Sequence, residues 1–495
     1  MTETIKIRSP SNEELIRELP VHSSEDVQDA IRSSREIFPY WSGLSSKERN
    51  GYFKKVRKIF LEEKEKIVDT LHQETGKTKT DALIAEVFLS VGILKFYEEN
   101  SEEFLKDQKV KGFGISASKD LHVRYFPYGL VGVITSWNYP LLLTFSDAFP
   151  ALMAGNCVLA KPSSLTPLTA LMLDDIFKRA GIPEGVYKTI VCKGRSNATD
   201  TFVKGVDMVA FTGSTNVGIS VGKACIEDLK PCTLELGGKD PMIVLEDAKL
   251  ERAANAAVFG SLMNTGQTCI SIERIYVVDS VYSEFVSKVV EKTGSLTVGE
   301  DEGFNTDVGS MTSEGQLNEV MEQIDDAVRK GARILLGGKR IDRRGYFLEP
   351  TVIVDVNEGM DIMTEETFGP VIAIRRVKDA DEAIELANSS IYGLNGAVFT
   401  NDIEKGLEIA GKIESGSLCI NDCLINYGFA ELPFRGVKKS GIGVRHSEAG
   451  IKRFCRSQSV VVDRIGSKKE VYWYPHSKNG ADMMLRAIDQ LYKVD

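Results

Sequence analysis

Residues 130–135, which read Leu-Val-Gly-Val-Ile-Thr, and residues 141–153, which read Leu-Leu-Leu-Thr-Phe-Ser-Asp-Ala-Phe-Pro-Ala-Leu-Met, decide the fold. The first run has the length and the β-branched content of a buried strand, and the second is long enough for a buried helix. The alternation continues with a strand at 157–160, a helix at 166–180 and strands at 186–191 and 206–211. Strands that alternate with helices predict parallel βαβ units and a doubly wound α/β sheet.

Three of these strands end in polar or glycine-containing turns, at the edge where a parallel sheet binds its ligands. The turns are residues 135–140 (Thr-Ser-Trp-Asn-Tyr-Pro), 161–164 (Lys-Pro-Ser-Ser) and 211–218 (Phe-Thr-Gly-Ser-Thr-Asn-Val-Gly). In the third turn, Ser214 or Thr215 can cap the next helix, whose free N–H groups attract a phosphate. This turn lacks the Gly-x-Gly-x-x-Gly pattern and by itself also fits a plain turn. An array of three turns, one of them with a lysine, favours a nucleotide.

Cys269 lies in a Gly-Gln-Thr-Cys sequence, just after the helical pattern of residues 250–262. A thiol at the end of a packed helix can serve as a nucleophile, although most free cysteines are small buried hydrophobic residues. Glu235 stands between two leucines at the end of an apolar run. This setting fits a general base whose pKa is changed by burial, and it also fits a surface glutamate or an ion-pair partner of Lys239.

Composition restricts the class of protein. The 495 residues allow two or three domains, and 42% apolar and 27% charged residues are typical of a soluble globular protein. The net charge of −10 argues against a nucleic-acid or anionic-membrane surface. No apolar run approaches the ~20 residues of a membrane span. The eight cysteines have no paired spacing and no cationic, apolar leader opens the chain, so we expect reduced thiols and the cytoplasm. Cys419 and Cys423 lack the further ligands of a zinc site, so we expect no metal.

The remaining segments give coarser predictions. Residues 1–105 are predicted as helical, with a capping box at Ser45 to Glu48 and a later helix through 85–97. Residues 107–127 alternate as in a β-ribbon. A second β/α series starts at 242–245. Towards the C-terminus we expect an amphipathic helix with its apolar face over 317–328, a strand at 457–462 that could pair in a neighbouring subunit, and a short helix within 470–495.

The chain resembles the aldehyde dehydrogenase superfamily from residues 74–77, Glu-Thr-Gly-Lys, to about residue 450. The matching motifs occur in order at 136–140, 161–162, 211–218, 235–239, 266–269, 365–370 and 433–441. The resemblance implies a three-layer α/β fold. It implies a Rossmann-like cofactor-binding domain at 1–106 and 128–237, a catalytic domain at 238–440, a β oligomerisation arm at 107–127 and 455–466, and a C-terminal extension at 467–495.

The resemblance also implies roles for individual residues. Cys269 would be the nucleophile and Glu235 the general base, while the side-chain amide of Asn138 and the backbone amide of Cys269 would form the oxyanion hole. Lys161 would be a catalytic residue that also binds the adenosine ribose of the cofactor. Lys239 would hold neighbouring site residues in position. The residues implied for cofactor binding are Trp137, Lys161, Ser163, Ser164, Gly213, Ser214 (pyrophosphate), Gly237, Glu366 (nicotinamide ribose) and Phe368 (nicotinamide).

The implied reaction is the NAD(P)+-dependent oxidation of an aldehyde to the acid through a cysteine thiohemiacetal and a thioester. None of the five histidines lies beside the motifs, which disfavours a Cys-His hydrolase. Two alternatives remain: an acylating enzyme that uses coenzyme A or phosphate, and a non-catalytic scaffold that kept the fold. Glu235 disfavours the coenzyme A branch, which generally lacks this base.

Two departures from the family bear on specificity. Ser164 stands where many NAD-using members have glutamate, and an uncharged side chain there removes repulsion towards a 2′-phosphate. We therefore expect NADP to be slightly favoured over NAD. Arg435 stands where the family has glycine. It is a candidate clamp for an anionic substrate.

The substrate is expected to be succinate semialdehyde or another aliphatic aldehyde. Residues 266–274 and the Tyr-Trp-Tyr-Pro segment at 472–475 are similar to bacterial succinate-semialdehyde dehydrogenases. Some of those enzymes place arginine where Met263 stands and a second cysteine where Ser271 stands. The residues expected to form the substrate pocket are Tyr139, Met263, Ile270 and Phe434. We expect a homodimer or homotetramer, with no nucleic-acid or membrane partner.

Overall fold

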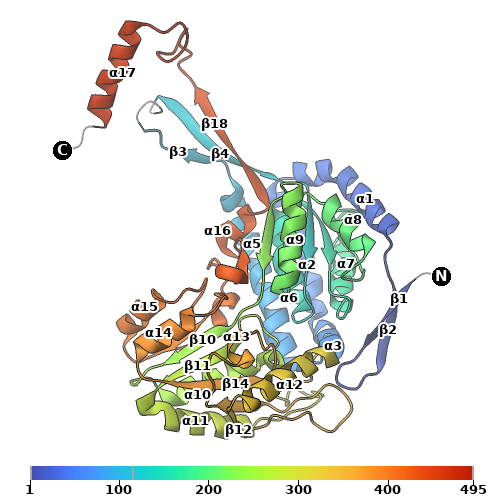
Figure 1. Cartoon of the computed structure of the whole chain (residues 1–495). Coiled ribbons are helices and arrows are strands. Elements are labelled where there is room, and N and C mark those ends of the chain that lie inside the picture. The colour runs from blue at the N-terminus through green and yellow to red at the C-terminus, as the bar shows by residue number, and fades with distance from the viewer. Residues whose placement is uncertain (1–2, 114–115, 117, 493–495) are drawn as a thin grey trace.

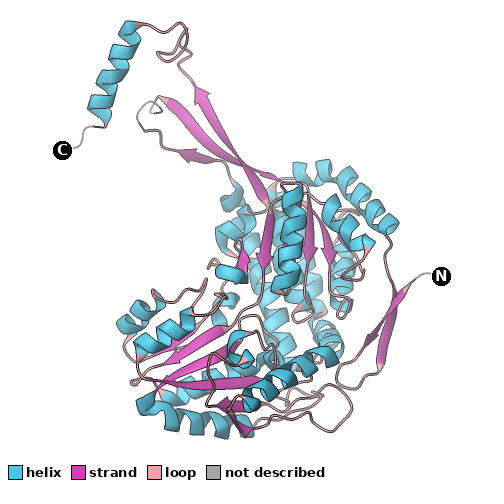
Figure 2. Cartoon of the chain, in the orientation of Figure 1, coloured by secondary structure: helices cyan, strands magenta, loops and turns pink. Residues whose placement is uncertain are grey.

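The computed structural model of the chain describes residues 3–113, 116 and 118–492. Residues 114, 115 and 117 of the predicted ribbon and 493–495 of the predicted extension lie outside this range. Two sheets covered by helices form the body, and a ribbon that ends in a separate helix projects from it (Figure 1, Figure 2). This arrangement confirms the α/β prediction.

The first sheet holds the predicted βαβ series. Its strand order is β17-β9-β8-β5-β6-β7, and every neighbouring pair is parallel except β17 with β9. The strands are β5 (Leu130–Ile134), β6 (Cys157–Lys161), β7 (Tyr187–Thr189), β8 (Met208–Thr212), β9 (Cys232–Glu235) and β17 (Gly441–Ile442). The helices that follow strands in this series are α6 (Pro140–Met153), α7 (Leu168–Arg179), α8 (Asn197–Gly205) and α9 (Thr215–Glu227). All residues of β5, β6 and β8 are buried, as expected for a sheet covered on both faces.

The N-terminal fifth of the chain, residues 3–105, packs mainly as helices. They are α1 (Ser24–Gly43), α2 (Ser46–Glu62), α3 (Lys64–Thr75), α4 (Lys79–Asp81), the π-helix η1 (Ala82–Phe88) and α5 (Leu89–Leu105). The capping box before α2 is confirmed, because Ser45 Oγ accepts from the Glu48 N–H and Glu48 accepts from the Ser45 N–H. The prediction of helix from residue 1 was wrong at its start. Strands β1 (Thr4–Arg8) and β2 (Leu15–Pro20) form an antiparallel hairpin, because Ile7 and Leu19 bury their side chains together with Leu168.

The second sheet has seven strands in the order β12-β13-β14-β11-β10-β15-β16. They are β10 (Asp240–Val244), β11 (Ile272–Val278), β12 (Arg333–Leu336), β13 (Thr351–Val354), β14 (Val371–Val377), β15 (Ala397–Phe399) and β16 (Cys419–Ile420). The helices are α10 (Leu250–Leu262), the 3-10 turn η3 (Met263–Gly266), α11 (Asp279–Gly294), α12 (Glu314–Arg329), α13 (Asp361–Thr364), α14 (Ala380–Asn388), α15 (Ile403–Ala410), the 3-10 turns η4 (Ile425–Gly428) and η5 (Lys438–Ser440), and α16 (Ser447–Lys452).

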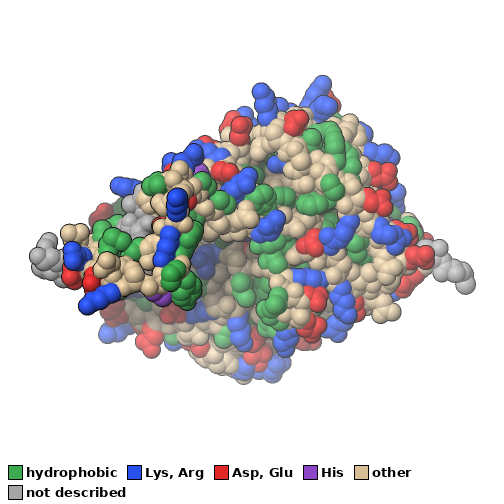
Figure 3. Space-filling view, turned by 90° about the horizontal axis from the view of Figure 1, so that it is seen from above, with side chains coloured by type: hydrophobic (Ala, Val, Ile, Leu, Met, Phe, Trp, Pro, Cys, Tyr) green, Lys and Arg blue, Asp and Glu red, His purple; other side chains and the backbone are tan. Residues whose placement is uncertain are grey.

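The projecting ribbon is a three-stranded antiparallel sheet of β3 (Gln108–Val110), β4 (Lys119–Pro127) and β18 (Cys455–Asp463). Beyond it lies α17 (Lys478–Leu491), none of whose residues is buried. Seen from above, hydrophobic side chains are interspersed with charged ones on this part of the surface (Figure 3). In the part of the chain that the structure describes, every helix is too short or too polar to cross a membrane.

Candidate active site

Cys269 follows a strained turn at the end of α10. Asn264 and Thr265 have φ values of 54° and 58°, a left-handed conformation that costs energy in residues other than glycine. Gly266 has φ 71°, and a Cβ there would lie 2.0 Å from the Gly369 carbonyl oxygen. The Asn264 N–H donates to the Asp81 carboxylate over 3.2 Å. The turn is thus fixed from two sides and sets the position of the thiol.

Asn138 directs its side-chain amide towards the same turn. Its Nδ2 donates to the Gln267 carbonyl over 2.9 Å, and its Oδ1 accepts from Ser136 Oγ over 2.6 Å. Only one of the two Nδ2 hydrogens is used in the contact with Gln267, so the other is available as a donor. The amide of Asn138 is therefore held beside Cys269 with a defined orientation.

The segment at 74–77 supports Asn138 from behind. Lys77 and Glu86 form an ion pair with both side chains fully buried, and Lys77 Nζ also donates to the Asn138 carbonyl over 2.7 Å. Glu86, which lies in the π-helix η1, accepts from the Leu141 and Leu142 N–H groups at the start of α6. The Lys77 ammonium lies 4.2 Å from the centre of the Tyr139 ring. The Lys77–Glu86 pair therefore links the loop that carries Asn138 to the N-terminal helices.

Glu235 ends β9 with a buried side chain, and neither of its carboxylate oxygens hydrogen-bonds to a described residue. Burial raises the pKa of Glu235 to about 7, against the opposing effect of Arg445 and Arg453. The alternative in which Glu235 pairs with Lys239 is wrong, because Lys239 Nζ contacts Glu273 at 2.7 Å. A buried carboxylate without a partner and with a pKa near neutrality has the properties of a general base.

A buried ion pair lies next to Glu235 in the first sheet. Thr212 on β8 is the direct neighbour of Glu235 on β9, and the Arg445 guanidinium bonds to the Thr212 hydroxyl. Arg445 also donates to both oxygens of Asp147, with Nε to Oδ1 at 2.9 Å and Nη2 to Oδ2 at 2.5 Å. Side chains of paired residues share one face of a sheet, so the cation lies on the Glu235 side.

The Cys269 thiol is protonated in this environment. Burial, followed by the nearby carboxyl groups of Glu366, Asp240 and Glu235, raises the pKa of Cys269 to about 12. A thiol is a much weaker nucleophile than a thiolate, so reaction at Cys269 requires that its proton be removed. Glu235 is a carboxylate that can take it.

A cavity of about 200 Å³ connects Cys269 with the predicted cofactor residues. It is bordered by Ser136, Trp137, Asn138, Thr212, Gly213, Ser214, Leu236, Gly237, Cys269, Gln316, Glu319, Glu366 and Phe368. Six residues expected to bind the cofactor are thereby brought together, namely Trp137, Gly213, Ser214, Gly237, Glu366 and Phe368. The Trp137 and Phe368 rings pack edge to face at 5.4 Å.

The groups around this cavity fit a dinucleotide. Ser214 occupies the N-cap of α9, but its hydroxyl does not cap the helix, which leaves the hydroxyl and the helix N-terminus for an anion. A Cβ at Gly237 would lie 2.5 Å from the Glu366 carboxylate, so a larger residue there would displace this carboxylate. Burial raises the pKa of Glu366 to about 8, and its Oε1 accepts from the Gly238 N–H over 3.1 Å.

The loop that carries Glu366 and Phe368 is held by Glu273 on β11. The Glu273 carboxylate accepts from the N–H groups of Thr367 and Phe368 over 2.8 and 2.9 Å. Lys239 bridges the same carboxylate and the Thr367 hydroxyl, which lies 2.8 Å from its Nζ. Sequence reasoning missed Glu273, although two adjacent charged residues, Glu273 and Arg274, ahead of the apolar run of β11 were a usable signal.

Lys161, Ser163 and Ser164 do not border this cavity. Lys161 ends β6, the strand beside β5, and Ser163 and Ser164 follow it; the Lys161 carbonyl accepts from the Thr135 N–H. Lys161 is buried, and burial lowers the pKa of its ammonium. They therefore lie at the adjacent strand end of the same sheet edge, where a second part of a dinucleotide can extend.

A second, apolar cavity of about 60 Å³ also borders Cys269. It is bordered by Ala85, Leu89, Tyr139, Leu142, Leu143, Met263, Thr268, Cys269, Ile270, Leu424 and Tyr427. The structure brings Tyr139, Met263 and Ile270 here as expected. It does not bring Phe434 here, because that ring packs behind Tyr427 at 4.8 Å and is 2% exposed. Tyr427, from η4, takes the place predicted for Phe434.

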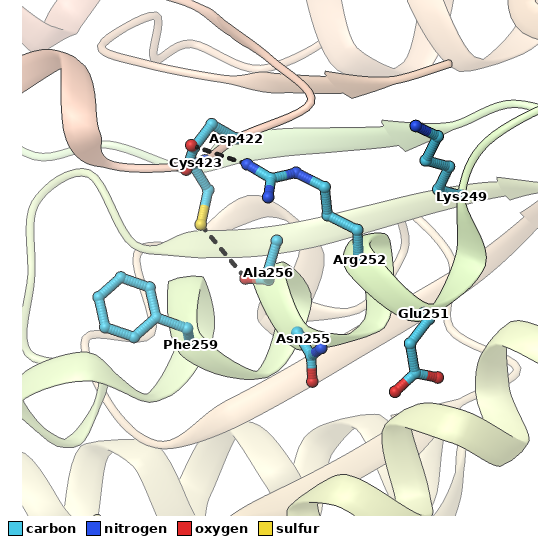
Figure 4. Close-up of a pocket in the computed structure, with 8 residues that line it drawn as sticks. All are labelled: Lys249, Glu251, Arg252, Asn255, Ala256, Phe259, Asp422 and Cys423. Carbon is cyan, nitrogen blue, oxygen red and sulfur yellow. Dashed lines mark hydrogen bonds and ion pairs between the residues drawn. The ribbon is translucent and has the colours of Figure 1, made fainter. Parts of the chain in front are cut away.

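A surface hollow of about 500 Å³ beside α10 offers no comparable chemistry. It is lined by Lys249, Glu251, Arg252, Asn255, Ala256, Phe259, Asp422 and Cys423 (Figure 4). The Arg252 guanidinium pairs with Asp422 at 3.0 Å, and the Cys423 thiol donates to the Ala256 carbonyl. The guanidinium and the thiol in this hollow are thus already bonded to neighbouring groups. The two cavities that border Cys269 are the candidate active site.

Comparison with known proteins agrees with this geometry. The aldehyde dehydrogenase family profile matches residues 1–460. The chain is 35% identical over 494 residues to a 4,4'-diapolycopene aldehyde oxidase of Methylomonas sp, covering 99% of this chain and 92% of that protein. It is 37% identical over 452 residues to a Mycobacterium ulcerans protein provisionally named an NADP+-linked succinate-semialdehyde dehydrogenase, covering 90% and 86%. The crystal structure of an NAD-dependent aldehyde dehydrogenase from Sinorhizobium meliloti superposes with a TM-score of 0.91 at 32% identity, covering 95% of this chain and 93% of that one.

Proposed function

The chain belongs to the aldehyde dehydrogenase family, and from this premise we propose that it oxidises an aldehyde to the carboxylic acid with NAD or NADP, using Cys269 as nucleophile and Glu235 as base. One observation carries the assignment of the base. The Glu235 carboxylate is buried and makes no hydrogen bond to any residue that the structure describes, and burial raises its pKa to about 7. Burying such a carboxylate costs folding free energy, and groups with pKa values perturbed in this way cluster at functional sites.

The first chemical step joins Cys269 to the aldehyde carbon. Because the pKa of the thiol is about 12 and that of Glu235 is about 7, the proton moves to Glu235 as the C–S bond forms and not before. The new oxyanion accepts hydrogen bonds from Asn138 Nδ2 and the Cys269 N–H. Loss of one such donor typically costs ~10²–10³ in rate.

NAD or NADP, when bound, supplies the hydride acceptor of the reaction. The residues proposed to hold it are Trp137, Gly213, Ser214, Gly237, Glu366 and Phe368 around the larger cavity, and Lys161, Ser163 and Ser164 at the next strand end. Before the second half of the reaction, Glu235 must release the thiol proton to solvent. Its carboxylate then takes a proton from the water that attacks the thioester carbon, the C–S bond breaks, and the proton passes to the Cys269 sulfur, which leaves the acid and the free thiol.

We propose that NADP is accepted and slightly favoured over NAD. Ser164 is uncharged and partly exposed at the end of β6, close in sequence to the Lys161 cation. A carboxylate at this position would repel a 2′-phosphate, whereas serine does not. The mycobacterial relative carries NADP+ in its name, and the Sinorhizobium structure is described as NAD-dependent.

The substrate is proposed to be an aliphatic or other apolar aldehyde. Every side chain that borders the smaller cavity is uncharged apart from the Cys269 thiol in its ionised form. Succinate semialdehyde is the second candidate, favoured by the name of the mycobacterial relative. Arg435, proposed as an anion clamp, is exposed and does not border the cavity, so the geometry gives this hypothesis no support.

We also propose the domain division and the oligomer expected from the sequence. The first sheet recruits β17 from residues 441–442, just beyond the proposed end of the catalytic domain at residue 440. The ribbon of β3, β4 and β18 would be the oligomerisation arm. Exposed apolar side chains on α17, including Leu485 and Ile488, give a second copy of the chain a surface to cover.

The test is the reduction of NAD and NADP with a panel of aldehydes that includes succinate semialdehyde. Wild type is compared with Cys269→Ala and with Cys232→Ala, a matched change at another partly exposed free cysteine. We expect turnover in wild type and Cys232→Ala, and none in Cys269→Ala. A requirement for coenzyme A or phosphate would favour the acylating alternative, and cofactor binding without turnover of any aldehyde would favour the scaffold.

A further inference from the structure

The smaller cavity is too small for a long substrate. At about 60 Å³, and with ~10–15 Å³ needed for each water-sized probe, it holds only a few non-hydrogen atoms beside the Cys269 thiol. A longer aldehyde must therefore leave part of its chain outside. The side chains around the opening of this cavity, its mouth, determine whether the outer part of the substrate chain is bound.

Two segments border the cavity and carry large exposed hydrophobic side chains next to their lining residues. In η1 and the start of α5, Ala85 and Leu89 line the cavity, while their neighbours Ile84 and Phe88 are 53% and 71% exposed. Residues four apart share one side of a helix, so Ile84 and Phe88 form one apolar strip beside the lining pair.

The second segment repeats this pattern. Leu424 and Tyr427 line the cavity, and Ile425 and Phe429 beside them are 47% and 46% exposed. The two segments touch, because a Cβ built at Gly428 would lie 3.3 Å from Leu89 Cδ2. The four exposed side chains therefore flank the place where both walls of the cavity meet.

We propose that Ile84, Phe88, Ile425 and Phe429 form an outer subsite, here called the apolar rim, that binds the alkyl chain of a long aldehyde whose carbonyl lies at Cys269. This inference rests on the proposed function and names the substrate class of that site. The rim residues adjoin the lining residues Leu89 and Tyr427 along the chain, so an alkyl chain that leaves the cavity between these two would meet the rim. Apolar side chains at a mouth bind alkyl groups and give no partner to a distal carboxylate.

The rim predicts a dependence on chain length. A fully buried methylene is worth about a fourfold gain in affinity, and on a surface that covers one side we expect about twofold. The value of kcat/KM should therefore rise along the linear series from propanal to decanal. It should be lower for succinate semialdehyde than for pentanal.

The test compares wild type with a Phe88→Gln, Phe429→Gln double variant. The matched control is Leu407→Gln, which removes a hydrophobic side chain that is 53% exposed on α15 and borders neither cavity. In the double variant the ratio of kcat/KM for decanal to that for propanal should fall about tenfold, while the control keeps the wild-type ratio. Decanoate, the product, should inhibit wild type more strongly than the double variant.

Any of three results would overturn the inference. If wild type oxidises aldehydes with no rise in kcat/KM along the series, or if the double variant shows the same rise as wild type, the role of the rim is refuted and the proposed function stays intact. If wild type oxidises no aldehyde of any length, the proposed function fails and the rim fails with it. Equal losses for propanal and decanal in the double variant would show general damage to the site and would also count against the rim.

Discussion

Replacing Lys77 with methionine should destabilise the protein and slow catalysis together. Lys77 and Glu86 are an ion pair with both side chains fully buried. Lys77→Met leaves the Glu86 carboxylate without its cation, and breaking a buried pair in this way costs about 3–5 kcal/mol. The same change removes the 2.7 Å hydrogen bond to the Asn138 carbonyl, which holds the proposed oxyanion donor in place.

A double variant separates the effect of the unpaired charge on stability from the effect of the lost hydrogen bond. In Lys77→Met, Glu86→Gln, no unpaired charge remains, and the glutamine oxygen can still accept from the Leu141 and Leu142 N–H groups. We expect the double variant to lose only about 1.5–3 kcal/mol, the usual worth of one hydrogen bond from a charged group. Both variants should lose about tenfold or more in kcat, less than the ~10²–10³ that follows loss of an oxyanion donor.

The assay is urea unfolding at several pH values, with initial rates measured beside it. Burial already raises the pKa of Glu86, and the effect grows once Lys77 is gone. The single variant should therefore recover stability as the pH falls towards about 4.3, the ordinary glutamate value, because protonation removes the buried charge. Equal destabilisation of the single and double variants, with no pH dependence between them, would refute the reasoning.

Three further predictions concern the base and the cofactor side of the site. Hydrolysis of the acyl-enzyme should rise with pH through about 7, because burial raises the pKa of Glu235 to about 7 and only its carboxylate form accepts a proton from water; a flat profile in rapid-quench experiments would contradict this. Ser164→Glu should shift the ratio of kcat/KM from NADP towards NAD by about tenfold or more, through repulsion of the 2′-phosphate, and an unchanged ratio would deny Ser164 this role. Glu273→Gln should raise the KM for the cofactor more than it lowers kcat, since Glu273 holds the loop of Glu366 and Phe368; equal effects on both constants would speak against a positioning role.

The fold was largely predictable because its signals are local. The strands at 130–135 and 157–160 are continuous apolar runs, and the structure places β5 and β6 within one residue of them. The capping box at Ser45 was predicted from four adjacent residues. The N-terminal hairpin was missed because β1 and β2 are short and exposed, so the alternation in them is weak.

The site was predictable where a motif carries the chemistry and not where contacts are long-range. Cys269 and Asn138 each lie in a motif and border one cavity, and Glu235, from a third motif, is close enough to contribute to the raised pKa of the Cys269 thiol. The roles of the three residues stay a prediction. The partner of Lys239 is Glu273, 34 residues further along the chain, and adjacency in sequence could not show this. Tyr427 borders the pocket and Phe434 does not: the backbone at 434 pairs with residue 445, and the Phe434 ring packs against Tyr427 and His446. Periodicity within one segment does not report such a pairing.

The most direct test of the account is mass spectrometry of a Glu235→Gln variant mixed with cofactor and aldehyde. If Cys269 is the nucleophile and Glu235 accepts first the thiol proton and later a proton from water, the variant should form the thioester slowly, at a rate that rises with pH, and should fail to hydrolyse it. The peptide that contains Cys269 should then gain the mass of the acyl group, and it should gain none in Cys269→Ala. Steady turnover by Glu235→Gln at the wild-type rate, with no acyl group on Cys269, would contradict the proposed mechanism.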